Sequence, residues 1–193
     1  EVPTLVARTG YSGELGYELF FPREYAEGMW DAAFAAGERF GIVPCGLGAL
    51  RSVRMEKKYP LYGLDLSETT SPLEASLGWT VRFEKGDFLG RDALLRQRDA
   101  GVSRRLVGIE LGAGDPLPKA GDTIALDGAQ VGSVTSSDIG HAIGRTLAMG
   151  YVALDAVTDG TAVTVTLVET GQALAGTVRT EAFYDPGRVR VRA

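Results

Sequence analysis

Short apolar runs separated by glycine open the chain, and they predict a β-hairpin. Residues 3–8 (TLVART) predict a strand that leads into a turn, and residues 16–21 (GYELFF) predict the returning strand. The turn between them carries Gly10, Gly13 and Gly16. Glycines at this spacing let the backbone adopt positive φ angles and come close to another surface. A turn that also carries aromatic and acidic side chains is well placed to meet a flat, hydrogen-bonding ligand.

The segment that follows the hairpin has a helical period. Pro22 and Gly41 are the punctuation expected just inside the start and just past the end of a helix, here of about four turns. Apolar side chains recur at spacings of four along it, and we interpret this stripe as the core-facing side of the helix. The stripe consists of Tyr25, Met29, Trp30, Ala33 and Phe34.

Four further elements are predicted before residue 104. Residues 47–57 predict a second helix, with apolar and basic side chains on neighbouring faces. Residues 59–79 are rich in turn-forming residues and predict an irregular segment. Residues 80–83 (TVRF) predict a strand, and residues 90–101 predict a short helix.

From Arg104 onward the pattern becomes one of short β-rich runs separated by turn signals. Six such runs are LVGIEL, DTIALD, QVGSVTSS, TLAMGYV, TAVTVTLVE and ALAGTVRT. Short strands at regular spacing favour a small barrel or sandwich. The predicted fold class is therefore α+β, with a mixed portion at residues 1–100 and an all-β domain at residues 104–193.

Composition narrows the classes of function. The 193 residues are 45% hydrophobic and 23% charged, which is typical of a soluble globular protein. The formal net charge of −5 argues against nucleic-acid binding. No apolar run is long enough to span a bilayer. The single cysteine, Cys45, cannot form an internal disulfide, which fits a reducing, cytoplasmic compartment. The single histidine, His141, excludes a metal site built from several histidines. Because the chain begins at Glu1 rather than at methionine, we expect a processed product or a piece of a longer protein.

Glu14 and Glu18 are the first candidates for chemistry. A carboxylate can accept two parallel hydrogen bonds from an N–C–NH₂ edge, which pterins and guanines present. Glu14 lies on the predicted turn and Glu18 lies in the returning strand. A solvated hairpin that carries incidental acids is the alternative, and spacing alone favours it.

Arg54 is the second candidate. In the predicted helix it could bind an anion, stack on a planar ligand, pair with Glu56 or Glu74, or remain solvated.

His141 lies between glycines, and we interpret it as a structural hydrogen-bonding residue rather than a catalytic base. No dinucleotide or phosphate-binding glycine motif is present.

An ordered series of motifs along nearly the whole chain resembles the aminomethyltransferase family, the T-proteins of the glycine cleavage system. The series is GYSGELGYELF, PCGLGALRSVRMEKKYPLYGLDL, SPLEASLGWTV, DFLGRDALLRQ, VGSVTSS, AMGYV and FYDPGRVR. The resemblance implies a tetrahydrofolate-dependent one-carbon transferase, with three domains around a central folate pocket. This chain resembles the later part, namely a portion of the ferredoxin-like α+β region followed by the C-terminal barrel. The family's catalytic aspartate lies in the earlier part, so we assign no catalytic residue here and expect the fragment alone to be inactive.

The resemblance also implies site residues. It points to Glu18 as the acid that grips the pterin edge, with Glu14 as second choice, and to Tyr11 and Tyr62 as aromatic walls. Arg54 matches an arginine of the family helix and would position the cofactor or support the acids. Leu50 stands where the family usually has an arginine, which is a departure from the pattern.

Three functions follow from the resemblance. The first is aminomethyl transfer to folate from a lipoyl carrier protein, with folate as the small-molecule partner and no metal. The second is the folate module of a sarcosine or dimethylglycine dehydrogenase, or a stand-alone demethylase, because RMEK, GDFLGRDALLRQRDAGVSRRLVGIEL and IGHAIGR resemble those branches. The third, from another class, is a folate-binding protein without catalytic activity.

Overall fold

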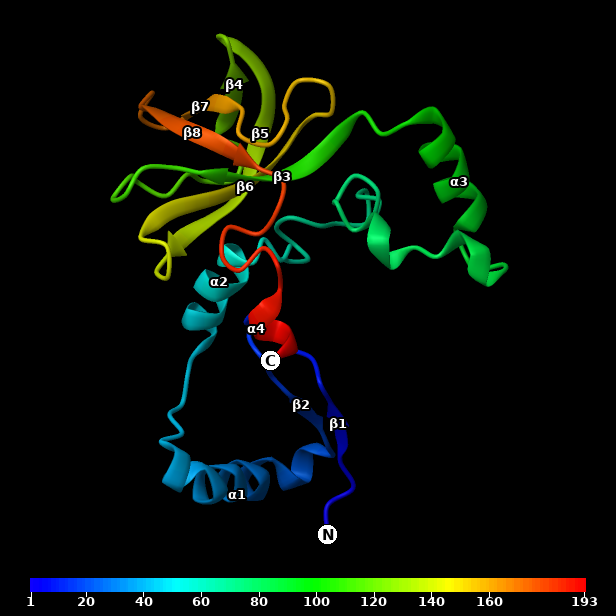
Figure 1. Ribbon diagram of the computed structural model, residues 1–193, viewed down its shortest axis with the longest axis vertical. Coiled ribbons are helices and arrows are strands. Elements are labelled where there is room, and N and C mark those ends of the chain that lie inside the picture. Colours follow the sequence, from blue (N-terminus) through cyan, green and yellow to red (C-terminus); the bar gives the residue numbers. More distant parts are fainter.

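A computed structural model describes residues 1–193, and it places a β-barrel above an open frame of helices and a small sheet (Figure 1). The first part contains β1 (Leu5–Ala7), β2 (Glu18–Phe20), η1 (Arg23–Tyr25), α1 (Ala26–Gly37), η2 (Glu38–Phe40), α2 (Leu47–Glu56), η3 (Gly78–Thr80), η4 (Phe83–Lys85) and α3 (Arg91–Ala100). The second contains β3 (Arg104–Glu110), β4 (Thr123–Leu126), β5 (Ala129–Gly140), β6 (Arg145–Ala153), β7 (Ala162–Thr166), β8 (Ala173–Arg179) and α4 (Val189–Arg192). The predicted α+β class is thereby confirmed.

Six antiparallel strands close the barrel in the order β3-β6-β5-β4-β7-β8, and β8 pairs back with β3. The six β-rich runs of the sequence correspond to these strands one for one. Closure leaves no free sheet edge in the barrel, so every strand has a hydrogen-bonded neighbour on both sides.

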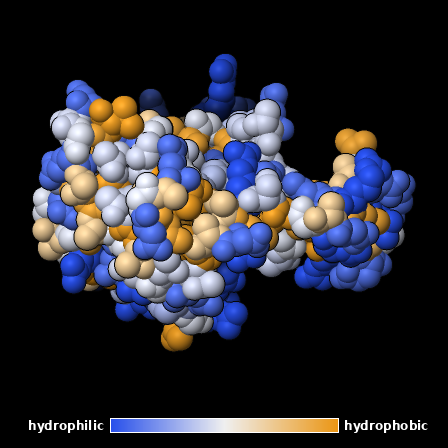
Figure 2. Space-filling view, turned by 90° about the horizontal axis from the view of Figure 1, so that it is seen from above, coloured by the Kyte–Doolittle hydropathy of each residue, from blue (hydrophilic) through white to orange (hydrophobic).

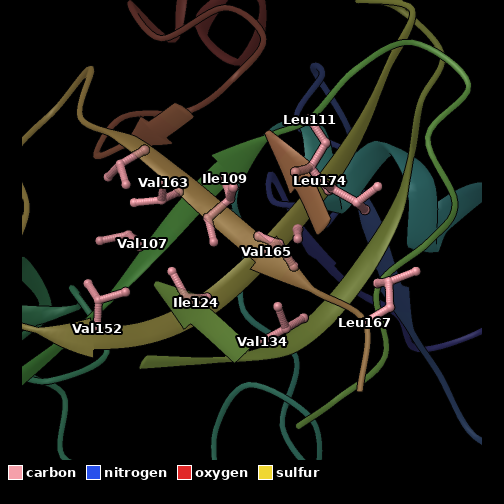
Figure 3. Close-up of a cluster of buried hydrophobic side chains, with 12 residues drawn as sticks. Val107, Ile109, Leu111, Ile124, Val134, Val152, Val163, Val165, Leu167 and Leu174 are labelled. Carbon is pink, nitrogen blue, oxygen red and sulfur yellow. The ribbon is translucent and has the colours of Figure 1, made fainter. Parts of the chain in front are cut away.

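Alternate side chains of the strands fill the barrel interior, as the two-residue period of a strand requires (Figure 3). The interior cluster is Val107, Ile109, Leu111, Ile124, Val134, Ala148, Val152, Val163, Val165, Leu167, Leu174 and Val178. The chain's main hydrophobic core therefore lies inside the barrel.

The outer face of the barrel has a second, smaller core beneath α2. Residues 146–152 of β6 are buried without a break, because inward side chains enter the barrel while outward ones pack outside it. Leu147, Met149 and Tyr151 cluster there with Met55 of α2. This contact fixes α2 to the barrel and so positions everything that α2 carries.

The strands β1 and β2 and helix α1 form the part of the chain farthest from the barrel (Figure 1). The hairpin is confirmed, with Ala7 opposite Glu18 in the register. The interpretation of the α1 stripe as core-facing is wrong for this chain, because α1 buries no side chain and Trp30 is 58% exposed. The physical reason is that α1 packs mainly against its own flanking turns η1 and η2, and no side chain of the helix is buried, so no second layer covers its apolar side.

The segment between α2 and α3 is irregular, as predicted for residues 59–79, and it contains no strand. Residues 80–83, predicted as a strand, instead join the short 3-10 turns η3 and η4. The amide of Val81 donates to the carbonyl of Gly78, and no neighbouring chain offers a ladder. Helix α3 is confirmed, and the segment that carries it projects to one side of the barrel (Figures 1 and 2).

The C-terminal segment, residues 180–193, returns from the barrel to the glycine turn (Figure 1). The amide of Tyr184 donates to the carbonyl of Glu56, and Lys57 Nζ lies 2.6 Å from Asp185 Oδ2. Arg190 Nε lies 2.7 and 2.9 Å from the two carboxylate oxygens of Glu14. Polar contacts thus hold the end of the chain beside its beginning.

Acid should weaken this attachment. The hydrogen bond from Lys57, aided by the amides of Val189 and Arg190, lowers the pKa of Asp185 below its ordinary value. The stabilisation is therefore present above the unfolded-state pKa of about 4 and disappears as the pH falls through the lower, folded-state pKa. We expect the free energies of unfolding of the wild type and of Asp185→Asn to approach each other as the pH falls below the unfolded-state pKa of about 4. Asparagine suits the position because Asp185 has φ 47°.

Urea unfolding between pH 3 and pH 7 measures this difference. Asp155→Asn is the matched control, because Asp155 is exposed and forms no ion pair. A stability difference between wild type and Asp185→Asn that stays constant over this range would contradict the role assigned to the Lys57–Asp185 pair.

Candidate functional site

The glycine turn lies against the end of α2, and Gly13 makes this close approach possible. Gly13 has φ +78°, and a Cβ added there would overlap with the side-chain carbons of Lys57. Both the backbone angle and the space therefore require glycine at this position. The Lys57 side chain passes under the turn and continues to Asp185, so one buried lysine joins the turn, α2 and the C-terminal segment.

A hollow of about 550 Å³, which we call the first hollow, opens between the turn and the C-terminal segment. Its lining comes from residues far apart in the sequence, namely Arg8, Thr9, Gly10, Tyr11, Glu14, Gly16, Tyr59, Trp79, Arg188, Val191 and Arg192. The volume is within the range of small-molecule sites. Aromatic rings, a carboxylate and bare glycine backbone are thus gathered around one space.

Tyr11 forms the aromatic wall of the first hollow. Its ring stacks on Tyr59 with centroids 5.8 Å apart and planes at 29°. Its hydroxyl donates to the carbonyls of Tyr59 and Pro60 at 3.2 and 2.6 Å. Burial raises the pKa of Tyr11, although the nearby Arg54 opposes the shift. The ring is therefore held in one orientation, with a neutral hydroxyl.

Glu14 lines the first hollow, but its carboxylate is paired with Arg190. A carboxylate held from one side by a guanidinium keeps acceptor capacity for a second donor. Arg8, Arg188 and Arg192 line the same space. The first hollow therefore carries positive charge, although the whole chain has a net charge of −5.

Arg54 lies behind the wall rather than in the lining. Its side chain is 1% exposed, and Nη1 donates to Asp65 Oδ2 at 2.7 Å and to the Tyr59 carbonyl at 3.1 Å. Its partner is thus neither Glu56 nor Glu74. Nε and Nη2 of Arg54 are buried without a hydrogen-bond partner. By holding the Tyr59 carbonyl, Arg54 supports the same backbone to which Tyr11 is bonded.

Asp65 is the functional candidate that the sequence did not reveal. Its fully buried carboxylate accepts from Arg54, from the Leu61 amide at 2.9 Å, and from the hydroxyls of Thr135 and Ser136 at 2.5 and 2.6 Å. Neighbouring residues of a regular strand point to opposite faces, so two consecutive hydroxyls could not both reach it. A β-bulge between Val134 and Ser136 turns both toward Asp65.

The other candidates lie apart from the first hollow. Glu18 is exposed on β2, opposite Ala7, and Tyr62 is 66% exposed in the loop that leads to Asp65. His141 is exposed at the tip of the β5–β6 hairpin and makes no side-chain hydrogen bond, so its interpretation as a structural hydrogen-bonding residue is wrong. Of the five site candidates, the structure brings Tyr11 and Glu14 into the lining and Arg54 directly behind it.

Comparison with known proteins places the chain in a family. The GCVT N-terminal domain family matches residues 1–85, and the glycine cleavage T-protein C-terminal barrel domain family matches residues 104–185. An aminomethyltransferase of Halothermothrix orenii is 46% identical over 161 residues, which cover 83% of this chain and 45% of that protein. One of Symbiobacterium thermophilum is 42% identical over 185 residues, which cover 95% of this chain and 48% of that protein.

A solved structure agrees with these matches. The glycine cleavage system aminomethyltransferase T from Bartonella henselae superposes with a TM-score of 0.83 and 30% identity, over 94% of this chain and 50% of that one. The chain spans about half the length of the curated relatives it matches. No helix of the chain has both the length and the apolar character needed to cross a membrane. By its two domain matches, its relatives and its fold, the chain belongs to the aminomethyltransferase family, the T-proteins of the glycine cleavage system.

Proposed function

We propose that this chain holds tetrahydrofolate for one-carbon transfer and that the first hollow receives the pterin ring. The observation that carries the proposal is the meeting of the Tyr11–Tyr59 aromatic wall with a carboxylate and bare glycine backbone in one space of about 550 Å³. A pterin offers a flat face to the rings and an N–C–NH₂ edge to an acid. Family membership supports the same ligand.

The chain's residues would bind and orient the ligand rather than carry out its chemistry. When bound, tetrahydrofolate supplies the nitrogen nucleophiles that accept the one-carbon unit. Tyr11 limits the position of the ring, and holding a nucleophile in a reactive orientation can supply much of the rate enhancement. We assign no catalytic acid within these 193 residues. The portion 1–100 would hold the folate, and the barrel at 104–193 would complete the site through its C-terminal segment.

The aminomethyl group is the one-carbon unit that we favour. The similar proteins described above are named aminomethyltransferases, and none is named a dehydrogenase. The donor would then be an aminomethyl group on a lipoyl carrier protein, with ammonia released, in the cytoplasm. Such a transfer would require no metal from this chain.

Two carboxylates compete for the pterin edge. Glu18 is the residue to which the resemblance points, and its carboxylate is exposed and unpaired on β2. Glu14 lies in the first hollow but already holds Arg190. Glu18 lies outside the lining of the first hollow, so we propose that it grips the edge of the pterin that projects from the hollow towards β2, while Glu14 anchors the C-terminal segment beside it. Tyr62, exposed in the neighbouring loop, would add an aromatic wall.

Glutamine substitutions test this assignment. Tetrahydrofolate should raise the melting temperature of the protein by about 5 °C at a hundredfold excess over its Kd, because it binds the native state alone. Glu18→Gln should weaken binding about tenfold, since a charged hydrogen-bonded contact contributes about 1–3 kcal/mol. Calorimetric titration measures both proteins, and Glu24→Gln, an exposed acid of η1, is the control.

Two results would contradict these assignments. Normal binding by Glu18→Gln together with weak binding by Glu14→Gln would transfer the pterin contact to Glu14. No change in melting temperature at saturating tetrahydrofolate would refute the folate proposal itself.

The Arg54–Asp65 pair generates a second prediction. Asp65→Asn leaves the guanidinium buried beside a neutral partner, so the free energy of unfolding should fall by about 3–5 kcal/mol. Thr135→Val removes one of four donors and should reduce it by only about 1 kcal/mol. Urea unfolding measures both, with the exposed Asp87→Asn as control. Equal losses for Asp65→Asn and Asp87→Asn would show that the pair contributes nothing to the fold.

A further inference from the structure

The outer part of the C-terminal segment, residues 188–193, borders two hollows. We call residues 188–193 the strap. Its residues Arg188, Val191 and Arg192 line the first hollow. Arg188 and Arg192 also line a second hollow of about 450 Å³, together with Pro186 and Gly187, which lead into the strap. A segment that borders open space in this way can move without displacing packed side chains.

The strap is attached to the protein by exposed contacts. None of residues 188–193 is buried, and Val189 is 71% exposed. Every side-chain hydrogen bond of the strap is exposed to solvent, namely those from the amides of Val189 and Arg190 to Asp185, from Arg190 to Glu14, and from Arg8 to the carbonyls of Arg192 and Ala193. Water competes for each of these bonds, so each stabilises the attachment only slightly.

The residues that precede the strap are held much more firmly. Phe183 packs against the smaller core beneath α2. Asp185 pairs with Lys57, whose side chain is 3% exposed. A segment with few buried contacts opens locally at a lower free energy than its surroundings. The strap can therefore detach while residues 180–185 stay in place.

The Glu14–Arg190 pair joins the strap to the facing wall of the first hollow. Glu14 belongs to the glycine turn, and Arg190 Nε lies 2.7 and 2.9 Å from its two carboxylate oxygens. The two side chains are 41% and 57% exposed, so water and salt weaken the pair. Arg188 adds a second weak contact at the rim, where its guanidinium lies 5.7 Å from the ring centroid of the exposed Trp79.

We propose that the strap is a lid, that the Glu14–Arg190 pair is its latch, and that tetrahydrofolate enters and leaves the first hollow while the latch is open. This inference rests on the proposed function. A flat ligand that lies between the glycine turn and the strap needs these two walls to separate before it can enter. After entry, closure would place Val191 and Arg192 between the ligand and solvent.

A latch controls the rates of binding, whereas a ligand contact controls the affinity. Glu14→Gln removes the charge from one side of the latch, so the open fraction of the protein should rise about threefold. We expect the association and dissociation rate constants of tetrahydrofolate to rise about threefold each, while the Kd stays within a factor of about two of the wild-type value. Stopped-flow fluorescence measures both rate constants.

Matched variants separate the latch from a general effect of charge. Arg190→Gln should have the same effect as Glu14→Gln, and the double variant should behave like each single variant, because all three lose the same contact. Glu24→Gln and Arg23→Gln make the same changes of charge at exposed residues of η1, outside both hollows. These two controls should keep the wild-type rate constants.

Trypsin measures the opening of the strap without any ligand, because the strap contains Arg188, Arg190 and Arg192. Cleavage follows the open population when opening and closing are faster than cleavage. Mass spectrometry should show cleavage after Arg188 about threefold faster in Glu14→Gln than in the wild type or Glu24→Gln. Cleavage after Arg98, an exposed residue of α3, is the internal reference and should be equal in all three proteins.

Each contrary outcome overturns one proposal. Unchanged rate constants and unchanged trypsin cleavage in Glu14→Gln would overturn the lid and leave the folate function standing. A higher Kd caused by faster dissociation alone would make Glu14 a ligand contact rather than a latch. No binding of tetrahydrofolate to the wild type would overturn the proposed function, and the gating of its entry with it.

Discussion

The buried pair of Arg54 and Asp65 is the interaction on which the arrangement of the site depends. Arg54 comes from α2, and Asp65 is fixed to the barrel by two hydroxyls of the β5 bulge. Together they hold the loop at Tyr59, to which the hydroxyl of Tyr11 is bonded. A buried ion pair stabilises little by itself, but losing one partner is very unfavourable. Helix, loop, barrel and glycine turn are therefore constrained relative to one another through one polar cluster.

The C-terminal segment supplies the remaining wall of the first hollow. It leaves the barrel, crosses the end of α2 and meets the glycine turn, so residues near both ends of the chain line the same hollow. Its attachments differ in strength, because the Lys57–Asp185 pair is largely buried while Arg190 and Glu14 are partly exposed to solvent. Solvent and salt screen exposed pairs much more than buried ones. The outer contact is thus the more easily released, and Lys57 is the firmer anchor.

Charge is distributed in this chain in a way that its total conceals. The net charge is −5, yet both hollows are lined by arginine and lysine. Two of these cations, Lys58 and Arg188, are placed by backbone angles that most residues avoid. Stability alone would favour glycine at such positions. Lys58 and Arg188 thus occupy positions where the backbone angle favours glycine, and such conflicts are expected at ligand-binding sites.

The sequence by itself determined the elements and the family. The six β-rich runs and the helices at α2 and α3 depend on local periodicity, which a single chain displays directly. The sequence-based prediction was wrong at residues 80–83, because no neighbouring strand pairs with them. It was also wrong about the buried face of α1, because no other element covers the apolar side of that helix. Only the tertiary structure revealed Asp65 and the hollows. A bulge that turns Thr135 and Ser136 to one side, and a segment that returns across the whole chain, are decided by long-range contacts that leave no periodic signal.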